Sequence, residues 1–223
     1  ATTATLTITI TPNVTPTFAA VGPYCSGAVV PALPTTSTNG ITGSWSPAIN
    51  NTTTTLYTFT PTAGQCATTA TLTITITPNV TPTFAAVGPY CSGAVVPALP
   101  TTSTNGITGS WSPAINNTAT TLYTFTPTAG QCATTTTLTI TITPNVIPTF
   151  AAVGPYCSGA VVPALPTTST NGITGSWSPA INNTATTLYT FTPTAGQCAT
   201  TATLTITITP NVTPTFAAVG PYC

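Results

Sequence analysis

The side chains with reactive chemistry in this sequence are thiols and hydroxyls, and no ionisable partner accompanies them. The 223 residues include 7 Cys, and no Lys, Arg, Asp, Glu or His. A nucleophilic thiol or hydroxyl needs a neighbouring base, and general acid–base catalysis needs a titratable side chain. The composition therefore predicts a protein that is not an enzyme and binds no cofactor. Without cations to neutralise phosphate, nucleic acid and anionic membranes are also poor partners, and we expect no direct membrane insertion.

The cysteines belong to a repeat with a period of 66 residues. Residues 1–66 recur as 67–132 and 133–198, and residues 199–223 begin a fourth copy. The copies differ at three aligned positions. Thr53 and Thr136 each replace an Ala of the other copies, and Ile147 replaces a Thr. Such near-identity assigns any function to the array rather than to a special site in one copy.

Alternating apolar and Thr residues set the expected module boundaries. Residues 4–11 place Leu6, Ile8 and Ile10 on one face, which predicts a half-buried strand that Pro12 ends. The proline-flanked segment 12–16 is then a short, stiff linker. We expect a segment of a longer array, organised as a closing strand of a preceding module (1–12), three modules (13–78, 79–144 and 145–210) and the start of a following module (211–223).

Within a module the pattern predicts several short strands and no helix. Strands are expected at 17–21, 26–33, 41–45, 56–60 and 72–76, with a hairpin turn at Asn39-Gly40. Short strands with one apolar face fit a small two-sheet β-sandwich of immunoglobulin-like character. The fold class is therefore all-β, a tandem array of such modules with one disulfide each.

A module with a core this small is usually only marginally stable, so we expect a disulfide to stabilise it. The favoured pairing is within each module, Cys25–Cys66, Cys91–Cys132 and Cys157–Cys198, which leaves Cys223 without a partner. Closing such a loop contributes on the order of 4 kcal/mol in the chain-entropy model. The alternative pairing joins Cys66 to Cys91. Both place the protein in an oxidising, extracellular compartment, and two thiols per module fall short of the four ligands of a zinc site.

The aromatic residues allow two interpretations. Trp45, Trp111 and Trp177 are expected to pack over the disulfides as core anchors, as tryptophan does in immunoglobulin sandwiches. The alternative is a sugar-stacking platform formed by Trp45 with Tyr24 and Tyr57. The Thr-x-Thr rows are expected to keep an uncharged sheet hydrated, with ice binding as the weaker alternative.

Several sequence blocks carry a resemblance to a known family. Cys25-Ser26-Gly27, the segment 33–37, the segment 39–47 with its Trp-Ser-Pro block, and the segment 57–66 with its Thr-Ala-Gly-Gln-Cys block recur in every full repeat. The chain resembles the Ig-like tandem repeats of very large Bacteroidota surface proteins, including gliding-motility-type adhesins exported by the type IX secretion system. The resemblance implies a filamentous or stalk-like protein at the cell surface.

We therefore expect a structural extracellular protein, the repeat stalk or fibre of a bacterial surface adhesin or filament. Its partners would be neighbouring modules of the same array and other copies of the chain in a fibre. The alternative is a multivalent carbohydrate-binding repeat, which would gain strength by avidity rather than by new contacts.

Overall fold

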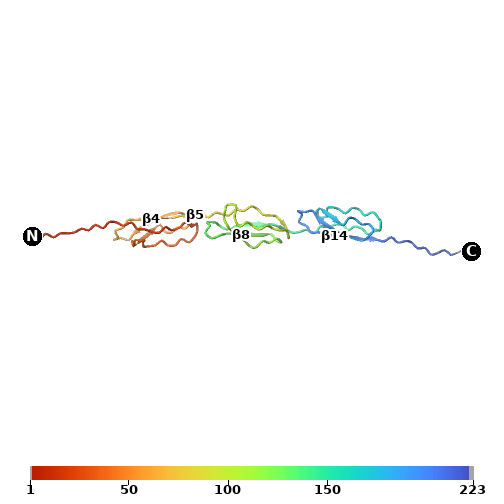
Figure 1. Ribbon diagram of the computed structural model, residues 1–223, viewed down its shortest axis with the longest axis horizontal. Helices are drawn as coiled ribbons and strands as arrows, with labels where there is room; N and C mark the ends of the chain where they lie inside the picture. The colour runs from red at the N-terminus through yellow and green to blue at the C-terminus, as the bar shows by residue number, and fades with distance from the viewer. Residues whose placement is uncertain (1, 221–223) are drawn as a thin grey trace. The chain divides into compact units, whose positions relative to one another are not determined.

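The computed structural model describes residues 2–220, and in that range it contains strands, turns and loops but no helix (Figure 1). The sequence accounts for this absence, because 24 prolines interrupt the chain and the apolar residues alternate with threonine. The structure thus confirms the prediction of an all-β tandem array of small modules.

The same strands recur in each repeat. In the first repeat they are β1 (Tyr24–Cys25), β2 (Gly43–Ser46), β3 (Thr55–Pro61), β4 (Ala70–Ile74) and β5 (Ile76–Thr77). Their counterparts are β6 (Tyr90–Cys91), β7 (Gly109–Ser112), β8 (Thr121–Pro127), β9 (Thr136–Ile140) and β10 (Ile142–Thr143), then β11 (Tyr156–Cys157), β12 (Gly175–Ser178), β13 (Thr187–Pro193), β14 (Ala202–Ile206) and β15 (Ile208–Thr209).

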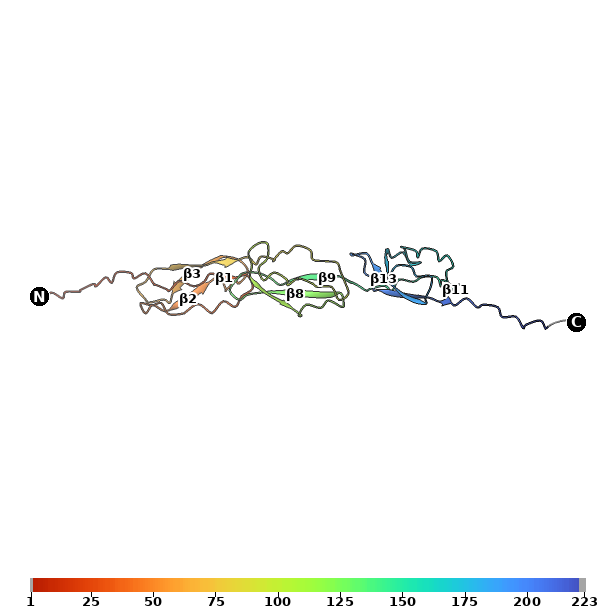
Figure 2. The same ribbon diagram turned by 45° about the vertical axis from the view of Figure 1, so that its right-hand side comes forward.

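Each repeat builds two open sheets from these strands. An antiparallel sheet has the order β2-β3-β4, with β2 and β3 side by side in Figure 2, and a parallel pair joins β1 to β5. The closing segment of the repeat, which contains β4 and β5, passes from one sheet to the other at Thr75. The Thr75 carbonyl accepts a hydrogen bond from the Tyr24 amide. At this crossing the Ile76 amide donates to Thr54 Oγ1 at 2.9 Å, so the change of sheet leaves that amide satisfied.

The core of the first repeat lies where these strands meet. Tyr57, Phe59 and Ile74 are fully buried, and Ile76 and Leu33 are nearly so. Along β3, Tyr57 and Phe59 point inward while Leu56 is 58% exposed, which is the period-two alternation of a half-buried strand. The same set recurs in the third repeat around Tyr189.

The expected turn at Asn39-Gly40 is confirmed. The Ser37 amide donates to the Ile41 carbonyl at 2.8 Å, and Thr36 forms an antiparallel bridge with Thr42. Gly40 has a φ of 85°, a conformation that glycine adopts without the steric cost that a side chain would bring.

The strands expected at 17–21 and 26–33 do not form, and that prediction was wrong. Other groups satisfy their backbone: the Thr17 carbonyl accepts from the Thr38 amide, and the Ala28 carbonyl accepts from the Asn51 side-chain amide. The Gly27 amide in turn donates to the Asn51 carbonyl. The strand on this side of the module is instead the short β1.

Residues 2–13 also lack the strand expected at 4–11. Leu6, Ile8 and Ile10 are 88%, 79% and 86% exposed. In the full repeat the equivalent segment pairs with β3, which precedes it in the sequence, and residues 4–11 follow no copy of β3 in this chain.

Backbone contacts divide the described chain into two compact units. One comprises residues 2–86, 99–113 and 123–138, and the other comprises 87–98, 114–122 and 139–220. Each unit therefore contains the boundary between two successive repeats. That boundary is where the sequence prediction and the structure differ most.

Candidate functional site

The disulfides join successive repeats rather than closing one repeat on itself. Cys25 is bonded to Cys132, and Cys91 is bonded to Cys198, each across a sequence separation of 107 residues. The predicted pairs Cys25–Cys66, Cys91–Cys132 and Cys157–Cys198 were wrong, and the alternative pair Cys66–Cys91 does not form either. Cys66 and Cys157 are exposed and unpaired within the described residues, and Cys223 lies outside them.

The parallel pairing of β1 with β5 explains why the predicted bond cannot form. Cys25 lies opposite Thr77, at the end of the closing segment, whereas Cys66 lies just before that segment begins. The 11 residues from Cys66 to Thr77, at roughly 3.3 Å each, span up to about 36 Å, which places Cys66 far from Cys25. A disulfide requires Cα atoms within about 7 Å, and the observed bond from Cys25 has a Cα–Cα distance of 5.0 Å.

A second set of contacts brings the next repeat to the same place. The Val80 amide donates to the carbonyl of Cys132 at 2.8 Å, just as the Val14 amide donates to the carbonyl of Cys66 one repeat earlier. The second cysteine of each repeat, Cys66 in the first, thus lies where the chain enters that repeat. The first cysteine, Cys25 in the first repeat, lies where the chain leaves it. The exit of one repeat adjoins the entrance of the next, so these two cysteines meet.

The linker Pro78-Asn79 is consequently enclosed by bonds on both sides. Thr77 pairs with Cys25 before it, Val80 bonds to Cys132 after it, and the Asn79 side-chain amide donates to the Ser26 carbonyl at 3.0 Å. At the next junction the Asn145 amide makes the same bond to Ser92. Each of these junctions has two covalent connections, the peptide chain and a disulfide.

The predicted tryptophan anchors pack in aromatic clusters. The Trp45 ring lies 4.6 Å from Phe18 and 5.2 Å from Phe59, measured between ring centroids. Its indole N–H donates to the Pro34 carbonyl at 2.8 Å, so the one polar atom of the side chain is satisfied. Trp111 and Trp177 repeat this arrangement with their own phenylalanine pairs. The within-module disulfides over which these rings were expected to pack do not form. The rings pack against Phe side chains, and the disulfides lie at the junctions between repeats.

The predicted sugar-stacking trio is not assembled. Tyr57 is fully buried, and its hydroxyl accepts a hydrogen bond from the Asn50 amide at 2.8 Å. Tyr24 is half-buried and packs against the core of the first repeat. Trp45 has a partly open face, but because Tyr57 is buried the three rings do not form a platform for a sugar.

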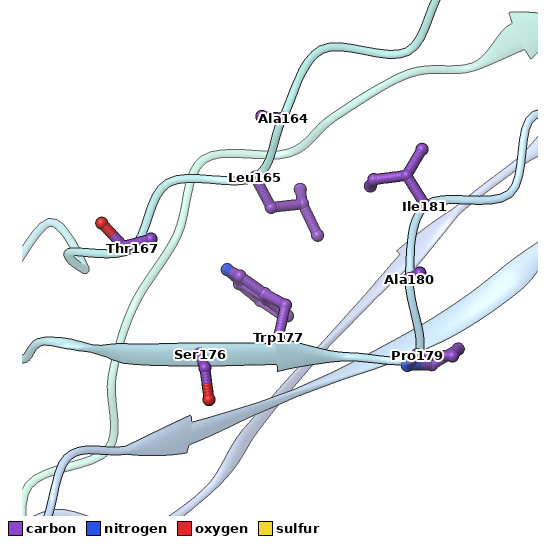
Figure 3. Close-up of a pocket in the computed structure, with 8 residues that line it drawn as sticks. All are labelled: Ala164, Leu165, Thr167, Ser176, Trp177, Pro179, Ala180 and Ile181. Carbon is purple, nitrogen blue, oxygen red and sulfur yellow. The ribbon is translucent and has the colours of Figure 1, made fainter.

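That open face borders a shallow hollow, which Figure 3 shows for the third repeat. Trp177, Leu165 and Ile181 border the hollow, which has a volume of about 250 Å³. The remaining lining residues are Ala164, Thr167, Ser176, Pro179 and Ala180. Trp45 borders an equivalent hollow in the first repeat. The lining is mostly apolar, and the side-chain oxygens of Thr167 and Ser176 point away from Trp177 in Figure 3.

The outer face of the three-stranded sheet carries hydroxyl groups. Ser44 lies opposite Thr60, and Thr58 lies opposite Thr71. These side chains alternate with the inward-facing Tyr57 and Phe59 along the strands. The sheet therefore presents a polar but uncharged surface.

Residues 2–220 contain no cluster of three or more His, Cys, Asp or Glu side chains that could hold a metal ion. No helix in the same range is long and apolar enough to cross a membrane. The two disulfides indicate an oxidising, extracellular environment. In comparisons with known proteins, no family model and no curated protein matches the chain.

Proposed function

We propose that this chain is a structural extracellular protein, a repeat segment of the stalk or fibre of a bacterial surface adhesin. The observation that carries this proposal is the disulfide at each junction between repeats. A bond within a module would stabilise that module alone. A bond between modules instead restrains the linker and resists separation of one repeat from the next.

The distribution of the other side chains supports a mechanical rather than a chemical role. The buried tyrosine, phenylalanine and isoleucine residues pack the cores, and Ser and Thr cover the outer sheet face without charge. The chain lacks His, Asp, Glu and Lys, the side chains that most often supply the acid or base in a hydrolytic or transfer reaction. We therefore propose that the protein is not an enzyme and that its partners are neighbouring modules and other copies of the chain.

The resemblance to Bacteroidota surface repeats supplies the cellular setting of this proposal. In that setting the array holds an adhesive domain away from the cell, or itself forms a filament. Identical repeats suit such a spacer, because its length can change by whole modules without creating a new kind of junction.

The hollow beside Trp45 and Trp177 favours a second candidate function, multivalent binding of carbohydrate. A partly open aromatic face can stack against a sugar ring, and its repetition would raise avidity. The mostly apolar lining and the burial of Tyr57 make this the weaker candidate.

Immunogold electron microscopy of intact source cells with antibodies against the repeat tests the main proposal. We expect labelling of extracellular stalks or filaments, and labelling confined to the cytoplasm would refute it. A glycan array with the Trp45→Phe, Trp111→Phe and Trp177→Phe triple variant as control tests the second candidate. Glycan binding that this variant loses would favour the carbohydrate role.

A further inference from the structure

The two disulfides overlap along the sequence, and this overlap has a consequence for broken chains. The order of the bonded cysteines is Cys25, Cys91, Cys132 and Cys198, so the second bond starts inside the loop that the first one closes. Every peptide bond between Cys25 and Cys132 is bridged by the first disulfide, and every one between Cys91 and Cys198 by the second. No peptide bond from Cys25 to Cys198 is left without a bridge.

We propose that the interleaved disulfides form a continuous second covalent path, which keeps the array in one piece after its backbone is cut. A single cut anywhere between Cys25 and Cys198 leaves the two fragments joined. One cut in each of the two linker regions also leaves all three fragments joined, because the first disulfide links the first fragment to the second and the other links the second to the third.

Pairing within modules would not give this property. Bonds from Cys25 to Cys66 and from Cys91 to Cys132 would leave residues 67–90 unbridged, and a cut there would divide the chain. These residues include the linker and the exposed Ala85 and Ala86, which lie outside the strands. Exposed segments of this kind are where proteases cut. The observed pairing thus bridges this exposed segment between modules, and this inference is independent of the proposed adhesin role.

The absence of Lys and Arg makes the test direct, since a single introduced lysine creates the only trypsin site in the chain. Ala19, Ala85 and Ala151 occupy the same position in successive repeats, and all three are exposed. Ala85→Lys places the site within the loop closed by Cys25–Cys132, and Ala151→Lys places it within the loop closed by Cys91–Cys198. Ala19→Lys places it before Cys25, outside both disulfides, and is the matched control.

The variants are produced in an oxidising compartment, their free thiols are alkylated, and they are digested with trypsin in a mild denaturant. Denaturing mass spectrometry then compares each digest before and after reduction. We expect Ala85→Lys and Ala151→Lys to remain one species, heavier by the one water consumed in hydrolysis, and to separate into two peptides only on reduction. The Ala19→Lys chain should release residues 1–19 with or without reductant.

The double variant Ala85→Lys/Ala151→Lys extends the test to two cuts. We expect one species heavier by two waters before reduction and three peptides after it. Release of separate peptides from Ala85→Lys or from the double variant without reductant would overturn the proposal, because that is the outcome of pairing within modules or of no pairing. Complete digestion is verified in each case by the reduced sample.

Discussion

Two segments of this chain have the same twelve-residue sequence and different structures. Residues 1–12 and 67–78 are identical, yet the second forms β4 and β5 while no strand occurs in the described part of the first. Ile74 is fully buried, and its counterpart Ile8 is 79% exposed. The alternating Thr and Ile pattern is therefore not sufficient for a strand. The segment becomes one where β3 and β1 are present to pair with it.

The same lesson applies to identical residues elsewhere in the repeats. Phe18 packs against Trp45, whereas Phe216 is 91% exposed. Cys132 is bonded to Cys25, whereas Cys66 is free and exposed. Each contrast offers a paired substitution in which the residue type is constant and only its partners differ.

The largest difference is expected from the buried isoleucine. Ile74→Ala removes a fully buried side chain from the core, which typically costs about 2–5 kcal/mol of unfolding free energy. Ile8→Ala should change that free energy by less than about 0.5 kcal/mol, as exposed substitutions usually do. Denaturant unfolding of both variants measures the difference, and equal losses would show that residues 4–11 are packed in solution.

The next difference concerns the cysteines. Cys132→Ser removes the first disulfide and should destabilise the unit that contains it by about 2–4 kcal/mol. Cys66→Ser removes a free exposed thiol and should change the unfolding free energy by less than about 0.5 kcal/mol. Thermal unfolding of the oxidised proteins compares the two. A larger loss for Cys66→Ser would contradict the observed pairing.

A smaller difference is expected from the aromatic clusters. Phe18→Leu replaces a ring that lies 4.6 Å from Trp45 and 4.8 Å from Phe59, and such aromatic pairs contribute about 0.5–1.5 kcal/mol beyond the area they bury. Phe216→Leu should have no measurable effect on unfolding. Near-ultraviolet circular dichroism checks whether the Trp45 environment changes only in the first variant.

The smallest effect is expected from pH and salt. With no Asp, Glu or His, the chain lacks the residue types that ordinarily titrate between about pH 4 and pH 7, and with no Lys or Arg either, there are no such charges for salt to screen. The unfolding temperature of each repeat should therefore shift by no more than about 2 °C over that pH range. A shift of many degrees would mean that a modification or ligand supplies charge.

Local sequence patterns predicted the elements whose pairing partners lie close by in the sequence. The Asn39-Gly40 turn and the alternating strand around Tyr57 and Phe59 form as predicted. The closing strand expected at 72–76 forms as two strands, β4 and β5, which belong to different sheets. The segments 17–21 and 26–33 could not be predicted, because side chains such as Asn51, distant in sequence, satisfy their backbone groups.

The disulfide between successive repeats was not predicted, because it depends on the direction of β1 relative to β5. Cys25 and Cys66 alone do not reveal whether β1 runs parallel or antiparallel to the closing segment. A parallel register places Cys25 next to Thr77, at the opposite end of the module from Cys66. Pro12 and Pro16, the two prolines of the predicted linker, indicated the boundary of the module. Only the strand register shows that the cysteines of successive repeats meet at that boundary.

The account rests on disulfides between repeats, and counting free thiols tests it most directly. Peptide mapping is less direct, because the sequences around equivalent cysteines are almost identical. The oxidised Cys223→Ser protein, which removes the one cysteine outside the described residues, is denatured and alkylated with and without the further change Cys66→Ser. The observed pairing predicts that two thiols, Cys66 and Cys157, react in the first protein and one in the second. Bonds within modules would give no reactive thiol in the first and one in the second, and that result would contradict the account.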